Sequence, residues 1–125
     1  MAGLERDSDA SGPLVRGFSP GGFSVDGHVW GAVLLTPADA VEWSPPSAVA
    51  ELSEADFAPL LALDPPPEFL LLGTGARHAQ PPRALRDALE ARGIGIEAMD
   101  SRAAARTWGL LRSEERWIAA ALMPL

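Results

Sequence analysis

The chain has 125 residues, the size of one domain, and 47% of them are hydrophobic, which is enough for one continuous core. It contains no cysteine, which excludes disulfides, thiolate metal sites and cysteine nucleophiles. The net charge of −7 argues against a general nucleic-acid binder, because such a protein needs a basic surface to neutralise phosphates.

The charge is distributed unevenly along the chain. Residues 1–76 contain two arginines against eleven acids, whereas residues 77–125 contain eight arginines against six acids. The two parts therefore carry −9 and +2. Arginines on solvated helix faces are the ordinary explanation of such a pattern.

The N-terminal segment is polar and small. Residues 1–13 bury too little apolar surface to offset their ordering entropy, which predicts a disordered tail, followed by a single domain over residues 14–125. The first nine residues lack the apolar region of a signal peptide, and the longest apolar run, Trp117–Met123, is far shorter than the ~20 residues that span a bilayer. We therefore expect a cytoplasmic protein without stable membrane insertion.

Strand signals dominate the next thirty residues. Leu14–Ser19 predicts a short strand that ends at the turn residues 20–22. Asp26-Gly27 is a strongly favoured two-residue hairpin turn, and it separates Phe23–Val25 from His28–Thr36. Both faces of His28–Thr36 are apolar, so we expect one strand that is covered on both sides.

A short strand and a helix follow. Ala40–Trp43 predicts a strand that ends at the Ser44-Pro-Pro-Ser47 turn. Ser53, followed by acids, is a helix N-cap pattern, and Phe57 and Leu60 fall on one face of that helix.

The clearest α/β signal comes after the prolines at 65–67. Phe69–Leu72 predicts a fully buried strand, and Gly73-Thr-Gly75 predicts a turn after it. A helix is expected over Pro82–Arg92, since proline suits a first helical position and Gly93 suits the C′ position.

The last third continues this alternation. Residues 94–98 predict a strand nearer the sheet edge, and Asp100-Ser101 provides caps for a helix over Arg102–Leu111. Ser113–Met123 is ambiguous: an N-cap, early acids and three alanines favour a helix, while its shortness and its apolar run favour a buried strand. The whole pattern predicts an α/β fold with one mixed sheet and helices packed on it.

Several motifs resemble one known family. Phe69-Leu-Leu-Leu-Gly-Thr-Gly75, Ile94-Gly-Ile-Glu-Ala-Met99 and the stretch from Ala103-Ala-Ala-Arg-Thr107 to Leu122 are similar to domain of unknown function 498, which has the Mth938-like fold. Gly22–Gly27 and Val33–Pro37 fit the same family, so the resemblance covers about residues 14–125.

The resemblance implies a three-layer fold around a central mixed sheet, with an N-terminal β-hairpin region and a closing strand antiparallel to its neighbours. A mitochondrial relative is an assembly factor for respiratory complex I, and the family has no catalytic residues to carry over. Two positions depart from the family pattern. Gly109 stands where an asparagine is usual, and Glu115 stands where a glycine is usual, which suggests a changed turn before the last strand.

A candidate binding site follows from strand order. If the strands 68–73 and 94–99 are parallel neighbours, their carboxyl ends lie at the same sheet edge, where a helix starting near Arg102 would point its amides toward an anion. The candidate residues are Gly73, Thr74, Gly75, Arg77, Asp100, Ser101, Arg106 and Thr107. The competing interpretation is structural, with Ser101 capping the helix, Thr107 bonded to its own backbone and Arg106 paired with an acid.

Other chemistry has little support. Gly73-Thr-Gly75 with Glu97 invites a dinucleotide interpretation, but His78 stands where the third glycine should be. Two histidines are too few for a histidine metal cluster, and no set of catalytic residues is indicated. No cofactor is implied.

We therefore expect a non-enzymatic accessory protein with a protein partner, assisting assembly of a respiratory or membrane protein complex. The alternative is a small-molecule protein or enzyme that binds an anion or nucleotide near Thr74, Gly75, Arg77 and Ser101.

Overall fold

The computed structural model describes residues 12–125, and most of the predicted N-terminal tail lies outside this range. At its start, Pro13 is buried, and its carbonyl accepts a hydrogen bond of 2.8 Å from the Trp108 indole nitrogen. The chain is therefore anchored to the last helix from Pro13 onward.

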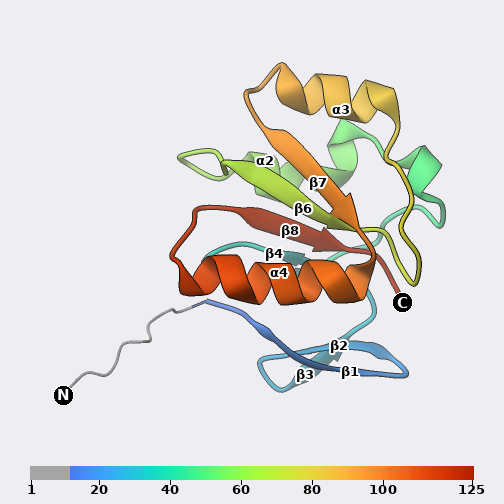
Figure 1. Ribbon diagram of the computed structural model, residues 1–125, viewed down its shortest axis with the longest axis vertical. Coiled ribbons are helices and arrows are strands. Elements are labelled where there is room, and N and C mark those ends of the chain that lie inside the picture. Colours follow the sequence, from blue (N-terminus) through green and yellow to red (C-terminus); the bar gives the residue numbers. More distant parts are fainter. Residues whose placement is uncertain (1–11) are drawn as a thin grey trace.

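Two β-sheets organise the described residues (Figure 1). The smaller is an antiparallel sheet of β1 (Val15–Ser19), β2 (Gly22–Val25) and β3 (His28–Trp30), in that order. The larger has the order β5 (Ala40–Glu42), β4 (Val33–Leu35), β8 (Ala119–Leu122), β6 (Phe69–Gly73) and β7 (Gly95–Met99). The mixed sheet and the N-terminal hairpin region are as predicted.

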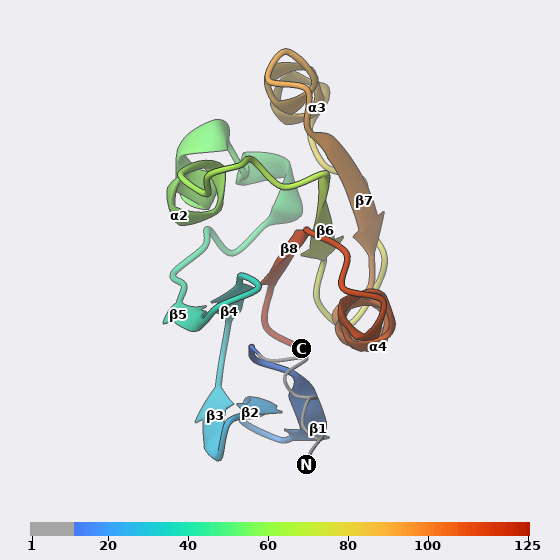
Figure 2. The same ribbon diagram turned by 90° about the vertical axis from the view of Figure 1, so that its left-hand side faces the viewer.

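In residues 12–125, five helical segments accompany the sheets: η2 (Val49–Glu51), η3 (Glu54–Phe57), α2 (Ala58–Leu61), α3 (Arg83–Glu90) and α4 (Ser101–Ser113). Figure 2 shows α2 and α4 on opposite sides of the larger sheet. The helix predicted from Ser53 starts as the 3-10 turn η3, where the Asp56 carboxylate accepts the Ser53 amide at 2.8 Å.

The core lies on both faces of the larger sheet, which explains the continuous apolar strands. Leu70 and Leu72 of β6 pack with residues of α2 and α3, whereas Leu71 packs with Trp108 of α4 and with Phe23 of the smaller sheet. This alternation gives the three layers that the family resemblance implies.

The predicted strand over His28–Thr36 is wrong in one respect, because it is two strands in two sheets. The chain bends at Gly31-Ala32, so that β3 stays in the smaller sheet while β4 enters the larger one. The three residues of β4 are buried, but Val29 of β3 is 57% exposed. Alternation alone did not show where the chain leaves the first sheet.

The closing segment is a strand, as the resemblance implies, and the local helix interpretation of Ser113–Met123 is wrong. Its alanines favour a helix in isolation, but Ala119–Leu122 are fully buried as a central strand, and burial on both faces outweighs propensity. The expected orientation needs one correction. β8 is antiparallel to β4 but parallel to β6.

Helices α3 and α4 end in the same way. In each, the amide that follows the residue with positive φ reaches back to the last turn: Ile94 N donates to Leu89 O at 3.0 Å, and Arg116 N donates to Leu111 O at 3.1 Å. Gly93 takes the left-handed position of the first, with φ of 79°, and Glu115 takes that of the second, with φ of 60°. The glutamate thus adopts the conformation that glycine favours.

This geometry predicts that Glu115→Gly stabilises the fold. A side chain in the left-handed region costs about 1–2 kcal/mol, and the greater chain entropy of glycine offsets about half of that, so we expect a gain of about 0.5–1 kcal/mol. Its exposed neighbour Glu114 has φ of −93° and provides the matched control. In urea unfolding, Glu114→Gly should lower the free energy of unfolding by about the same amount. Equal effects of the two changes would contradict the left-handed conformation of Glu115.

Candidate functional site

The carboxyl edge of the larger sheet brings distant parts of the chain together. Gly73 at the end of β6 is opposite Met99 of β7 and Leu122 of β8. Val33 at the start of β4 is opposite Leu122 on one side and Glu42 on the other. The carboxyl ends of β5, β6, β7 and β8 therefore lie at this edge. For β6 and β7, this is the arrangement predicted from parallel strand order.

Ser101 is the centre of the edge. Its side chain is fully buried, and its hydroxyl accepts from Gly75 N at 2.9 Å and donates to Met123 O at 2.8 Å. Its amide donates to Gly75 O at 2.8 Å. A Cβ at Gly73 would lie 2.8 Å from the Ser101 Cα, so only glycine permits this approach.

Thr74 also bonds to main-chain groups of the protein through both its hydroxyl and its amide. Its hydroxyl donates to Arg77 O at 2.6 Å and accepts from Ala79 N at 3.1 Å, while its amide donates to Met99 O at 2.8 Å. These bonds close the loop that follows β6. The hydroxyl thus already holds both a donor and an acceptor partner within the chain.

The start of α4 uses most of its amides internally. Asp100, and not Ser101, is the N-cap, and its carboxylate accepts from Ala103 N at 2.9 Å. Ala104 N donates to Asp100 O at 2.9 Å. A carboxylate therefore occupies the position at which we expected an external anion.

The remaining candidates lie further apart. Arg77 is an exposed residue of the loop after β6, and only its carbonyl contacts the other candidates, by accepting from the Thr74 hydroxyl. Arg106 is exposed on α4, while the Thr107 hydroxyl lies 3.5 Å from the Met99 sulfur and not against its own backbone. The structure thus joins Gly73, Thr74, Gly75, Asp100 and Ser101, but not the side chains of Arg77 and Arg106.

A cavity of about 550 Å³ opens beside this cluster, and sequence reasoning missed it. Trp43, Pro45 and Pro46 line it together with Thr74 and Met123. The available signal was the tryptophan and two prolines directly after a strand, because β5 ends at the same edge as β6. The Trp43 indole nitrogen donates to Asp56 O at 2.9 Å, so the ring presents an apolar surface.

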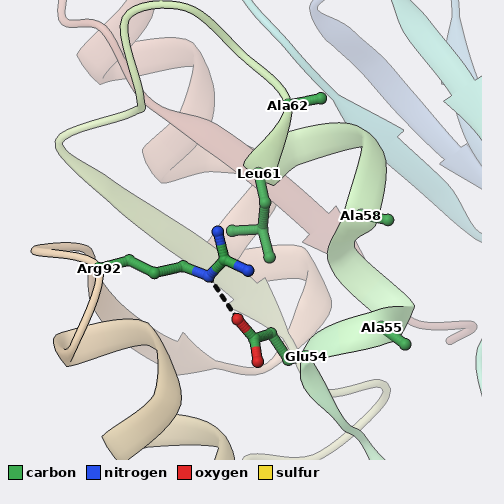
Figure 3. Close-up of a pocket in the computed structure, with 6 residues that line it drawn as sticks. All are labelled: Glu54, Ala55, Ala58, Leu61, Ala62 and Arg92. Carbon is green, nitrogen blue, oxygen red and sulfur yellow. Dashed lines mark hydrogen bonds and ion pairs between the residues drawn. The ribbon is translucent and has the colours of Figure 1, made fainter.

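A second cavity of about 440 Å³ lies between η3, α2 and the end of α3 (Figure 3). Glu54 and Arg92 form an ion pair across it, and three alanines of the helical turns border it. The pair joins the acidic first part of the chain to the arginine-rich second part.

At the opposite end of β6, Arg116 pairs with Glu68 at 2.7 Å. The hydrogen bond from Arg116 lowers the pKa of Glu68, and the same bond raises the pKa of Arg116. Any stabilisation from the lowered pKa is present above the ordinary carboxyl pKa and is lost as pH falls through the lowered one. Both side chains are more than a third exposed, so solvent screens the pair.

Comparison with known proteins identifies the family. The model of the family described as "Protein of unknown function (DUF498/DUF598)" matches residues 15–123. The chain belongs to this family. Within residues 12–125, no helix is both long and apolar enough to cross a membrane.

Relatives of this chain include proteins whose names state a role in assembly. The zebrafish (Danio rerio) protein named NADH dehydrogenase [ubiquinone] 1 alpha subcomplex assembly factor 3 is 34% identical over 97% of this chain and 69% of its own length. The human protein of the same name is 30% identical over 97% of this chain and 65% of its own length. An uncharacterized protein of Rhodobacter capsulatus is 35% identical over 96% of this chain and 92% of its own.

Solved structures agree with the fold. A Bordetella parapertussis crystal structure has a TM-score of 0.79 at 31% identity, covering 91% of this chain and 97% of that one. A Bordetella pertussis Mth938-like domain has a TM-score of 0.79 at 26% identity, and the match covers 99% of this chain and 92% of that domain's chain. The three-layer Mth938-like fold expected from the sequence motifs is confirmed.

The position of Ser101 in this DUF498 chain predicts a large effect of a small change. Ser101→Ala leaves the buried Gly75 N–H and Met123 C=O without their partner, which should lower the free energy of unfolding by about 2–3 kcal/mol. Ser113 also bonds a carbonyl, Leu110 O at 2.6 Å, but it is exposed. Ser113→Ala should change stability by less than about 0.5 kcal/mol in the same urea titration.

Proposed function

We propose that this protein is a non-enzymatic accessory factor that assists assembly of a respiratory NADH dehydrogenase by binding a protein partner. The observation that carries the proposal is the similarity to assembly factor 3 proteins along 97% of this chain. The cytoplasmic location predicted from the sequence belongs to the same proposal.

The chemistry of the sheet edge supports a binding role over a catalytic one. Catalysis at this edge would need side chains that are free to act on a substrate. The hydroxyls of Ser101 and Thr74 instead bond to main-chain groups on both sides, and Asp100 caps α4. These side chains hold the fold together.

Deletion of the gene in the native organism tests the proposal. We expect less fully assembled NADH dehydrogenase on native gels and lower NADH:quinone oxidoreductase activity in membranes, while succinate oxidation stays normal. Re-expression of the wild-type chain should restore both. Normal assembly in the deletion strain, under conditions in which growth requires the enzyme, would refute the proposal.

A small-molecule site at the same edge is the second candidate function, and the 550 Å³ cavity that reaches Thr74 favours it. In this case the ligand would bind beside Thr74, with Arg77 available from the neighbouring loop. Since the first-turn amides of α4 are used within the chain, an anion would find few unoccupied donors there.

A thermal-shift panel of nucleotides, phosphates and carboxylic acids separates the two candidates. We expect no stabilisation, because the two hydroxyls and most of the first-turn amides at the edge already have partners. A compound that stabilises the wild type and Arg83→Ala but not Arg77→Ala would favour the small-molecule site instead. Arg83 is a suitable control because it is equally exposed and starts α3, outside the cavity lining.

A further inference from the structure

Two neighbouring cavities lie between β3 and the carboxyl edge of the larger sheet. Next to the 550 Å³ cavity lies another of about 420 Å³, lined by β3 and by the end of β5. The two cavities share Gly31, Ala32 and Trp43, so they adjoin, and together they are called the groove below. Figure 2 shows β3 and β5 on the same side of the molecule, one below the other.

One border of the groove is the unpaired edge of β3. Within the described residues β3 pairs only with β2, in a register that places Val25 opposite His28 and Ser24 opposite Val29. The intervening turn has φ of 53° at Asp26 and 82° at Gly27, as in a tight two-residue hairpin. In such a hairpin the residues next to the turn exchange the ladder bonds, so the N–H and C=O of Val29 point away from β2.

The Val29 side chain adds an apolar contact at this edge. It is 57% exposed, and the only other large hydrophobic side chain of comparable exposure in residues 12–125 is Leu110 on α4, at 61%. An exposed valine on a free strand edge is a template for pairing with another strand. Lysines or prolines commonly protect such edges, and β3 has neither.

The larger cavity of the groove has a mainly apolar wall, whereas the wall of the smaller cavity is mixed and includes a carboxylate. Trp43, Pro45, Pro46 and Met123 line the larger cavity, and the indole nitrogen of Trp43 is already bonded within the chain. Glu42 is the carboxylate at the β5 side. From residue 17 to residue 76 the sequence contains eight acids and neither lysine nor arginine, so this part of the chain is uniformly negative.

We propose that the groove binds an extended segment of a partner protein, which pairs with β3 at Val29 and places an apolar side chain against Trp43. Lysine or arginine residues flanking that side chain face Glu42. Three observations specify this occupant: the unpaired main-chain edge selects an extended backbone, the walls select an apolar side chain, and the charge selects basic flanks. A second copy of this chain fits less well, because it would bring a second Glu42 and a second negatively charged segment against the first.

The inference rests on the proposed accessory function and specifies where the partner binds. A peptide of alternating lysine and valine is the first probe, with the full chain observed by NMR. We expect amide shifts at residues 28–32 and at the Trp43 indole. A peptide with N-methylated backbone should bind at least about tenfold more weakly because it cannot pair, and a glutamate–valine peptide should behave likewise through charge repulsion.

A matched pair of variants locates the binding. Val29→Lys places a charge on the β3 edge and should weaken binding of the lysine–valine peptide at least about tenfold. Leu110→Lys places the same charge at an exposed position of α4 and should leave that binding unchanged. Both positions are exposed, so both variants should fold. Undiminished binding to Val29→Lys, equal binding of the N-methylated peptide, or no shift with any peptide would overturn the inference.

Two further outcomes separate this inference from its alternatives. A wild-type dimer in sedimentation equilibrium that Val29→Lys converts to a monomer would assign the groove to a second copy and overturn the partner-segment proposal. In the deletion strain, we expect Leu110→Lys to restore NADH dehydrogenase assembly and Val29→Lys to fail. Full rescue by Val29→Lys would reject the groove and leave the accessory function intact, whereas a deletion without an assembly defect would reject the accessory function itself.

Discussion

The buried hydroxyl of Ser101 joins three elements that come from different parts of the chain. It accepts the amide of Gly75, after β6, and donates to the carbonyl of Met123, after β8, while its own backbone begins α4. In a buried environment such a network is stable only when every group is paired. The packing of α4 against β6 and β8, and thus one face of the core, depends on this junction.

The same junction shapes what the molecule can do. The hydroxyls of Ser101 and Thr74 and the carboxylate of Asp100 are used to close the sheet edge. In the proposed accessory function, recognition therefore rests on shape, main-chain groups and charge. The groove beside Trp43 lies next to the junction and shares Met123 with it, whereas the open edge of β3 takes no part in it. A protein that binds a partner segment can vary this surface while its fold stays intact.

Charged residues are also divided between two regions of the chain. Residues 17–76 contain eight acids and neither lysine nor arginine, and the arginines concentrate after residue 76. Where the two regions meet, the pairs Glu54–Arg92 and Glu68–Arg116 connect them at exposed positions. The groove border at Glu42 lies in the arginine-free part, which leaves it complementary to a basic partner.

Local patterns in the sequence determined the hairpin at Asp26-Gly27, the end of α3 at Gly93 and the capping of η3 by Asp56, because turns and caps depend on neighbouring residues alone. Parallel strand order also placed Thr74 and Ser101 at one edge. The tertiary structure alone decided that the alanines of β8 form a strand, that the chain changes sheets at Gly31, and that Ser101 bonds two distant strand ends. Burial from both faces and contacts between residues far apart in sequence decide these features, and no local pattern contains them.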